Sequence, residues 1–365
     1  MPSPYARTLV ADARTGVWAS FMREQGLDTW GIGRIQPGPA LFFAIGDFHA
    51  KRVFALAPVA SGVAVATDDG LRLVTGDGAI DMIAVGFPLT HLAGGPDGSL
   101  LAAGIDEDGA MNLLRWRPGR RPDRWRRAPG ARRRFKDLLG LFARPDGTAV
   151  LVTAGEILVL ARNALQPVKL RGTPLASPDS ARSSERKVPP VWIYDAAMMP
   201  DGAIALTGFA RNLVRWSGGR FDMIARGHFQ SLLVCPRSGS LWATDFDGNL
   251  WKDGKSGFGR VFAFPEGRIH TIWPGASGSI WLECAPNSGP HLLVPVPADA
   301  PVDAPENLWR AWVHEGVSLD LRPGLLSPGI LSAVPLFDGS LCLATNAGIW
   351  TIREAPDPSR LGEKR

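Results

Sequence analysis

The stretch SGSLWATDFDGNLWKDG, at residues 238–254, decides the fold because it contains two short strands and the turns that bound them. Glycine in the Ser238-Gly239 pair accepts the positive φ that a tight hairpin turn requires. The segments SLWAT and NLWK alternate apolar with small or polar residues and are rich in strand formers. The letters DFDG between these segments predict a second hairpin turn.

The same turn and strand recur along the whole chain. A turn pair whose glycine we call the anchor glycine precedes an apolar strand eight times, at Thr15-Gly16, Ser61-Gly62, Asp97-Gly98, Asp146-Gly147, Asp201-Gly202, Ser238-Gly239, Ser277-Gly278 and Asp338-Gly339. Another apolar strand precedes most of these turns, and a second hairpin follows most of them. Each unit therefore contains three or four antiparallel strands, and an uninterrupted unit spans about 36 to 39 residues.

Repeats of this size predict a β-propeller. A sheet of three or four strands cannot bury both of its faces alone, whereas a radial arrangement buries each sheet against its neighbours. Thirteen tryptophans supply large side chains for that packing. We therefore expect an all-β fold with one propeller domain over residues 1–365 and about eight blades. Seven blades is the alternative, if the first 50 residues complete the last blade or lie outside the ring.

Longer gaps between some anchor glycines indicate insertions between or within the units. The sequence predicts an Arg-rich insertion or rim segment, a flexible Ser- and Pro-rich loop, a Pro- and Asp-rich loop and a frayed tail, at residues 115–136, 172–190, 295–306 and 356–365 respectively.

Two units carry a family resemblance. SGSLWATDFDGNLWK (238–252) and DGSLCLATNAGIWTI (338–352) resemble the degenerate repeats of bacterial regulator-type and lyase-type propellers. The chain lacks the regular Gly-His and Trp-Asp pairs of WD40 repeats. Because such repeats encode blade packing and occur in sensors, scaffolds, enzymes and inhibitors, the resemblance implies the fold and leaves the function open.

The composition is that of a folded protein with a sizeable core. Hydrophobic residues make up 45% of the chain and charged residues 21%. No window approaches the roughly 18 apolar residues of a spanning helix, and no signal-type start is seen, so we expect no membrane association and a cytoplasmic location. Cys235, Cys284 and Cys342 offer neither a disulfide framework nor zinc spacing, so we expect each to be a small buried apolar side chain.

Positive charge is concentrated in RWRPGRRPDRWRRAPGARRRFK, at residues 115–136. This segment holds ten arginines and Lys136, so the rest of the chain is net acidic although the whole carries +5. Arginines interleaved with aromatic residues bind phosphates and bases, or grip an acidic protein surface; alternatively, they form a solvated loop. The candidate binding residues are Arg117, Arg120, Arg121, Arg124, Arg126, Arg127, Arg132, Arg133 and Arg134.

A second candidate site lies where the first strand of a unit begins beside the central channel. His91 and His270 precede their anchor glycines by seven and eight residues, and Tyr194 and Asp195 precede Gly202 by eight and seven. We expect the four residues to lie at one mouth of the channel, as a ligand-binding or acid–base cluster, or as partly buried polar residues satisfied by the backbone.

Motifs of catalysis or cofactor binding are not found elsewhere. The six histidines show no metal spacing. The acidic turns at residues 106–109 and 245–248 lack the remaining ligands of a calcium loop, so we expect hairpin turns. We expect no cofactor and no metal site, and the sequence favours a non-enzymatic role while leaving an enzyme as the alternative.

These observations favour a non-enzymatic propeller that binds a protein partner through one face or rim, with an acidic partner suited to the arginines. Toxin neutralisation in a bacterium and scaffolding of a complex are two forms of such a role. One alternative is a small-molecule sensor or lyase-type enzyme at the channel mouth, because GIGRI (31–35) is similar to part of a lyase-type repeat. Another is nucleic-acid binding through the Arg-rich segment. The oligomeric state is left open.

Overall fold

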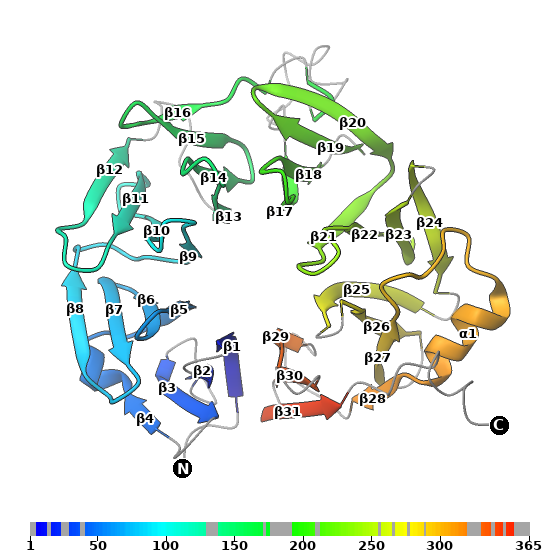
Figure 1. Cartoon of the computed structure of the whole chain (residues 1–365), viewed down its shortest axis with the longest axis horizontal. Coiled ribbons are helices and arrows are strands. Elements are labelled where there is room, and N and C mark those ends of the chain that lie inside the picture. The colour runs from blue at the N-terminus through cyan, green and yellow to red at the C-terminus, as the bar shows by residue number, and fades with distance from the viewer. Residues whose placement is uncertain are drawn as a thin grey trace.

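Each described anchor glycine lies where the first two strands of one small antiparallel sheet meet, and eight such sheets stand around a central channel (Figure 1). The computed structural model describes residues 5–12, 16–22, 29–36, 41–128, 138–170, 173–175, 192–208, 212–254, 257–264, 267–275, 278–287, 290–319, 330–336, 340–345 and 348–353. The propeller expected from the sequence is confirmed, with eight blades.

The chain builds the blades in order, and each blade uses consecutive strands. Blades 1 to 4 consist of β1 (Tyr5–Asp12), β2 (Gly16–Met22), β3 (Thr29–Gln36) and β4 (Leu41–Ala44); β5 (Val53–Val59), β6 (Gly62–Thr67), β7 (Gly70–Thr75) and β8 (Ile80–Ala84); β9 (His91–Gly94), β10 (Leu100–Ile105), β11 (Met111–Trp116) and β12 (Asp123–Arg127); and β13 (Leu138–Ala143), β14 (Ala149–Thr153), β15 (Ile157–Ala161) and β16 (Ala164–Pro167).

The second half of the ring repeats this plan. Blades 5 to 8 consist of β17 (Ile193–Met198), β18 (Ile204–Gly208), β19 (Asn212–Ser217) and β20 (Arg220–Arg226); β21 (Phe229–Val234), β22 (Leu241–Asp245), β23 (Asn249–Gly254) and β24 (Gly257–Ala263); β25 (Gly267–Pro274), β26 (Ile280–Pro286), β27 (His291–Val296) and β28 (Val317–Leu319); and β29 (Ile330–Pro335), β30 (Ser340–Thr345) and β31 (Gly348–Arg353). The first strand of each blade borders the channel, and the last lies at the rim (Figure 1).

The glycine turns form for the reason that the sequence indicates. Six anchor glycines have φ between +70° and +91°. In three of these turns an aspartate stabilises the bend, because its carboxylate accepts the backbone N–H two residues later, at Asp97, Asp146 and Asp201. Gly62 lacks a positive φ, and a Cβ there would lie 1.9 Å from the carbonyl oxygen of Val74. Gly339 is outside the described residues.

The hydrophobic core lies between neighbouring blades. Trp18, Trp242 and Trp281 are buried to 1% exposure or less, as expected for packing residues. One cluster joins blade 1 to blade 8, since Leu9 and Ala19 pack with Cys342 and Ala344. Blade 1 has its own four strands and closes the ring by packing against blade 8, so the seven-blade alternative is wrong.

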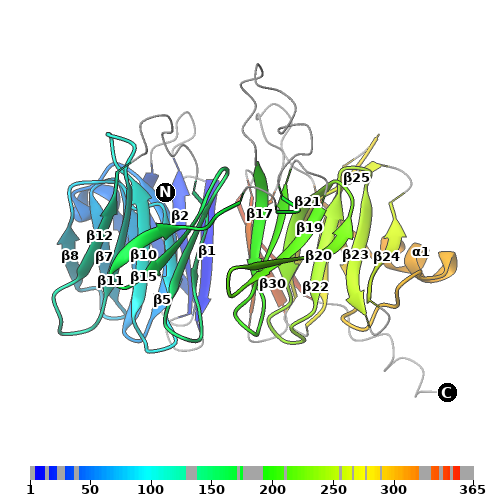
Figure 2. The ribbon, with the colours of Figure 1, turned by 90° about the horizontal axis from the view of Figure 1, so that it is seen from above.

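The predicted loop at residues 295–306 leads into a short helix that the sequence did not predict. Helix α1 (Glu306–His314) lies outside blades 6 and 7 (Figures 1 and 2), where Trp309 stacks on Phe262 with 6.0 Å between ring centroids. Lys252 holds the preceding loop by donating to the carbonyl oxygens of Ala298 and Ala300, at 2.5 and 3.2 Å. The segment is therefore docked on the rim.

The other predicted segments are described in part. The Arg-rich segment supplies the end of β11, a turn and the outer strand β12 of blade 3, and residues 129–137 lie outside the described part. Of residues 172–190 only 173–175 are described, and Leu175 there is buried at 1% exposure. The predicted tail, 356–365, also lies outside.

Candidate functional site

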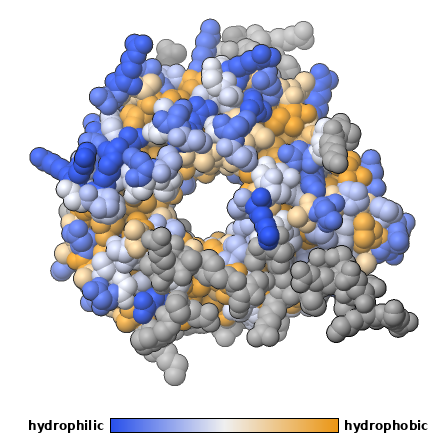
Figure 3. Space-filling model, in the orientation of Figure 1, coloured by the Kyte–Doolittle hydropathy of each residue, from blue (hydrophilic) through white to orange (hydrophobic). Residues whose placement is uncertain are grey.

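One mouth of the channel, where the inner strands begin, is shaped by a repeated β-bulge. In seven of the eight inner strands the register with the second strand shifts by one residue near the strand start. Such a bulge leaves one residue without a cross-strand partner and re-aims its side chain. The backbone register skips Arg7, Phe54, Leu139, Tyr194, Gln230, His270 and Leu331. The channel is open at its centre (Figure 3).

The bulge in β17 turns two consecutive side chains toward blade 6. Tyr194 contacts the ring of Phe246, in the turn between β22 and β23, with 5.9 Å between centroids in an edge-on arrangement. His228 contacts the same ring, with 6.4 Å between centroids. Phe246 is 45% exposed despite these contacts. We call Tyr194, His228 and Phe246 the aromatic cluster.

Asp195 ties blade 5 to blade 6 below this cluster. Its carboxylate accepts the backbone N–H of Leu232 at 2.7 Å and that of Ala196 at 2.8 Å. Burial raises the pKa of Asp195 to about 6, against these two hydrogen bonds, which favour the ionised form. The contacts give Asp195 a structural role in holding two blades together.

A second group of polar residues lies at the seam of blades 7 and 8. The rings of His270 and His291 stack with 5.7 Å between centroids, and Nδ1 of His291 lies 3.4 Å from Oε1 of Glu283. Glu283 is 3% exposed and accepts the backbone N–H of Ile330, in blade 8, at 3.3 Å. We call these three side chains the histidine–glutamate cluster.

Burial favours the uncharged forms of Glu283 and His291. It raises the pKa of Glu283 to about 7. It also lowers the pKa of His291, and the neighbouring His270 contributes to that shift. A carboxyl group with a pKa near 7 beside an uncharged imidazole is an arrangement capable of acid–base chemistry.

The four predicted mouth residues do not form one cluster. His91, Tyr194 with Asp195, and His270 come from blades 3, 5 and 7, at different points around the channel (Figure 1). His91 is partly buried and lies 3.0 Å from the hydroxyl of Thr90, and burial lowers the pKa of its imidazole. Each residue contacts its own or a neighbouring blade.

The described arginines of the Arg-rich segment largely bind within the chain. Arg117 pairs with Asp97 and Asp123, Arg126 with Asp106 and Asp108, and Arg127 with Glu156. Arg124 lies over the ring of Phe87, 4.4 Å from its centroid. The exposed turn between β11 and β12 contains Arg120 and Arg121. Arg132, Arg133 and Arg134 lie outside the described residues.

The acidic turns are hairpin turns, as expected. Oδ1 of Asp245 accepts the backbone N–H groups of Asp247 and Asn249, at 3.0 and 2.8 Å. Oδ1 of Asp106 likewise accepts the N–H of Ala110 at 2.8 Å. Among the described residues, no group of three or more histidine, cysteine or acidic side chains is arranged to hold a metal ion. None of the described helices is long and apolar enough to cross a membrane.

The three cysteines are free and buried, which confirms the expectation from their number and spacing. Burial raises the pKa of the Cys342 thiol to about 11, and that of the Cys284 thiol still higher. Thiolate chemistry at neutral pH is therefore disfavoured at both residues.

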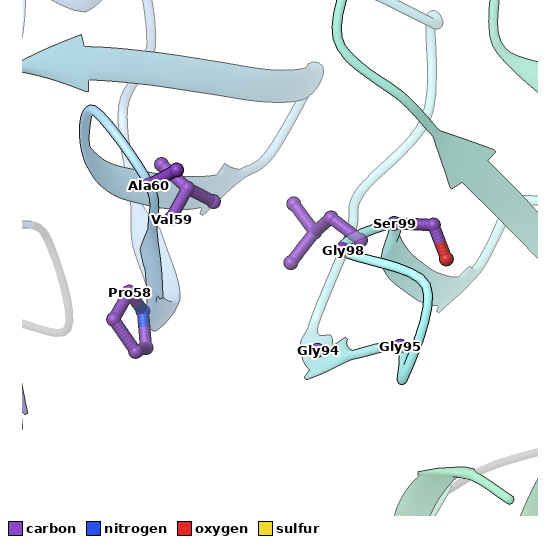
Figure 4. A pocket seen from close by; sticks show the side chains of 8 residues that line it. Pro58, Val59, Ala60, Gly94, Gly95, Gly98 and Ser99 are labelled. Carbon is purple, nitrogen blue, oxygen red and sulfur yellow. The ribbon is translucent and has the colours of Figure 1, made fainter. Parts of the chain in front are cut away.

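The opposite mouth carries a shallow cavity of about 310 Å³ between blades 2 and 3 (Figure 4). Its walls are the turns after β5 and β9, with Pro58, Val59, Ala60, Gly94, Gly95, Gly98, Ser99 and Leu100. Small residues and backbone dominate this lining. None of the charged residues discussed above lines this cavity.

No protein-family model matches the chain, and no curated protein matches it. Solved structures match nearly its whole length. The C-terminal WD40 domain of Sif2 is 13% identical, with a TM-score of 0.58, and the match covers 98% of this chain and 97% of that domain. Sqt1 from Chaetomium thermophilum is 12% identical, with a TM-score of 0.57 and 97% of both chains covered.

A streptogramin B lyase structure is similar to the same extent. It is 12% identical, with a TM-score of 0.54, and the match covers 97% of this chain and 94% of the lyase. At these identities the likeness shows the fold alone. The chain has the fold of a β-propeller, and the function has to be argued from its own surface.

Proposed function

We propose that this chain is a non-enzymatic β-propeller that binds a protein partner at the mouth where the inner strands begin. The observation that carries the proposal is Phe246, which projects from a turn and stays 45% exposed although Tyr194 and His228 contact its ring. Trp192, directly before β17 at the same mouth, is also 45% exposed.

Exposed aromatic side chains on a rigid support are the residues that anchor protein interfaces. Phenylalanine, tyrosine and tryptophan are enriched in the cores of protein interfaces, and an aromatic side chain has only two side-chain torsions to lose when a partner covers it. Here the support is rigid because Asp195 joins blades 5 and 6 directly beneath the ring contacts. Toxin neutralisation and complex scaffolding are both consistent with such a surface.

A small-molecule site has a different shape. It encloses most of its ligand in a concave pocket lined by convergent polar groups. The aromatic cluster instead presents Phe246 outward, and the cavity of about 310 Å³ lies at the other mouth. The geometry of the aromatic cluster therefore favours a macromolecular surface over a metabolite.

Affinity capture from the native host with wild-type protein and two variants tests the proposal. Phe246→Ala removes the exposed ring, and Met223→Ala, on the outer strand β20, removes a side chain of similar exposure, 47%, away from the mouth. We expect a stoichiometric protein in the wild-type and Met223→Ala samples and its loss from the Phe246→Ala sample. Equal capture by all three proteins would show that Phe246 is not part of the interface.

A second candidate function is acid–base chemistry on a small molecule at the blade 7–8 seam. It is favoured by the 3.4 Å approach of His291 to Glu283, whose pKa burial raises to about 7. The two functions separate in one experiment. A metabolite bound to the purified protein and lost in Glu283→Gln, with capture of a protein partner absent, would support this second candidate.

A further inference from the structure

The outer edge of β31, which pairs with no strand among the described residues, is a feature apart from the proposed mouth. Seven blades have four strands, whereas blade 8 has three in the part of the chain that the structure describes. β31 pairs with β30 along one edge, from Gly348 opposite Thr345 to Arg353 opposite Ser340. The other edge of a strand carries backbone N–H and C=O groups that can pair with a further strand.

In blade 6, the fourth strand contributes an aromatic side chain that packs on a third-strand tryptophan. Trp251 in β23 pairs with Ala243, four residues after its anchor glycine, and Trp350 in β31 pairs with Leu343, four residues after its own. The two tryptophans therefore occupy equivalent positions. Phe258, from the fourth strand β24, stacks on Trp251 with 6.3 Å between centroids and 3° between ring planes.

The same cover is found in blade 5, where Phe221 of the fourth strand packs beside Trp216, at 6.3 Å between centroids. Trp216 is only 3% exposed. Trp350, in contrast, is 41% exposed. Beside a fourth-strand phenylalanine, Trp251 is thus partly buried and Trp216 is buried, whereas Trp350 in blade 8 is exposed.

An exposed aromatic side chain also faces this place from blade 1. Phe42 in β4 is opposite Gly33, which is opposite Ala19 in β2, and directly opposed residues lie on one face of a sheet. Ala19 packs against Cys342 of blade 8, so this face is directed toward blade 8. Phe42 is 43% exposed.

We propose that the edge of β31 binds an extended segment of a protein partner, which adds as an antiparallel fourth strand of blade 8. An added strand points alternate side chains to its two faces. The segment therefore carries an aromatic residue toward Trp350 and an apolar residue toward Phe42, following the pattern of β24. This edge is separate from the aromatic cluster and does not depend on the function proposed for that cluster.

The segment that follows β31 in the sequence is a poor occupant of this edge on sequence grounds. Residues 354–365 read EAPDPSRLGEKR, with Pro356, Pro358 and no aromatic residue. Proline has no N–H to donate to a strand ladder. An incoming segment from another protein satisfies both the backbone and the aromatic requirement.

Hydrogen exchange of the full-length protein gives the first test. In the free protein we expect the amides of residues 348–353 to exchange at least about tenfold faster than those of the equivalent strand β23, because backbone groups at an open edge are protected poorly. Equal protection of the two strands would overturn the proposal, whether the cover is the chain's own continuation or a second copy.

The second test supplies the missing strand. The probe is the peptide GFGRVFA, the sequence of β24 (257–263), and the matched control is GAGRVFA, which lacks the stacking phenylalanine. We expect GFGRVFA to slow exchange at residues 348–353 in wild-type protein and in Phe246→Ala, and the effect to fall at least about tenfold with GAGRVFA or in Trp350→Ala. No protection at millimolar peptide, or equal protection by both peptides, would overturn the proposal. Because Phe246→Ala keeps the edge, a failure here is distinct from a failure at the mouth.

Discussion

Glu283 is the buried side chain whose raised pKa bears most directly on acid–base chemistry. Its pKa is about 7 in the folded protein, against an ordinary value of 4.5. Because the folded state holds the proton more tightly than the unfolded chain, the contribution of Glu283 to stability falls as the pH rises from about 4.5 to about 7. Glutamine at this position cannot titrate.

We therefore predict a pH-dependent difference between wild type and Glu283→Gln. Relative to the variant, the wild-type free energy of unfolding should fall by about 2 to 3 kcal/mol between pH 4.5 and pH 7.5. Urea unfolding at a series of pH values measures this difference. A constant difference over the range would show that Glu283 titrates near its ordinary pKa.

The histidines of the mouth should matter little for stability. His270 is exposed, and His91 is partly buried and uncharged near pH 7 because burial lowers its pKa. We predict that His91→Ala combined with His270→Ala lowers the free energy of unfolding by about 1 kcal/mol or less. Thermal unfolding checks this, and a loss of several kcal/mol would indicate that these residues support the fold.

Among the elements of the fold, the anchor-glycine turn is the one that recurs between the first two strands of the repeating units. Gly147 has φ +78° with open space where a Cβ would stand, whereas Gly155 has open space without a positive φ. We predict that Gly147→Ala destabilises the protein by about 1 to 2 kcal/mol and that Gly155→Ala is neutral or slightly stabilising. Chemical denaturation of both variants measures the contrast. Equal effects would show that backbone conformation is not what selects glycine at the turn.

The Arg-rich hairpin of blade 3 allows a comparison of paired and exposed arginines. Arg117 and Arg126 each bind two aspartates, whereas Arg120 and Arg121 lie in the exposed turn. We predict that Arg120→Ser with Arg121→Ser weakens any salt-sensitive binding to an acidic protein or to nucleic acid more than Arg117→Ser with Arg126→Ser does, because the paired side chains are already neutralised. Titrating the two double variants with the binding partner at two salt concentrations measures this difference.

Equal weakening by the two pairs would count against the exposed turn as the contact. A steep, log-linear salt dependence with DNA or RNA would favour nucleic acid over an acidic protein.

The predictions from sequence agree best with the structure where an element is determined by interactions between neighbouring residues. A glycine that must adopt positive φ, followed by alternating residues, can be predicted from a few neighbouring letters, so the turns and the first strands were predictable. The bulges at Tyr194 and His270 were not, because a one-residue register shift depends on the partner strand. His228, Phe246, Glu283 and His291 were missed because their contacts join residues that are far apart in the sequence, such as Tyr194 with Phe246. The only signal for Phe246 was an aromatic residue in an otherwise polar turn.

At the scale of the whole molecule, eight blades follow from eight repeats, but the closure of the ring does not. The sequence left open whether the first residues complete the last blade. The structure closes by side-chain packing between blades 1 and 8, with the N–H of Leu9 donating to the hydroxyl of Ser332 at 3.1 Å. Rigid blades around an open channel then place the aromatic cluster and the edge of β31 on separate surfaces.

The measurement that tests the central claim most directly is the affinity of the captured protein partner for purified wild type, Phe246→Ala and Met223→Ala. If the aromatic cluster anchors the interface, Phe246→Ala should raise Kd at least about thirtyfold, equivalent to about 2 kcal/mol, because a central aromatic anchor supplies that much binding energy. Met223→Ala should leave Kd within about twofold. An unchanged Kd for Phe246→Ala, with its fold confirmed by circular dichroism, would contradict the claim that the partner binds at this mouth.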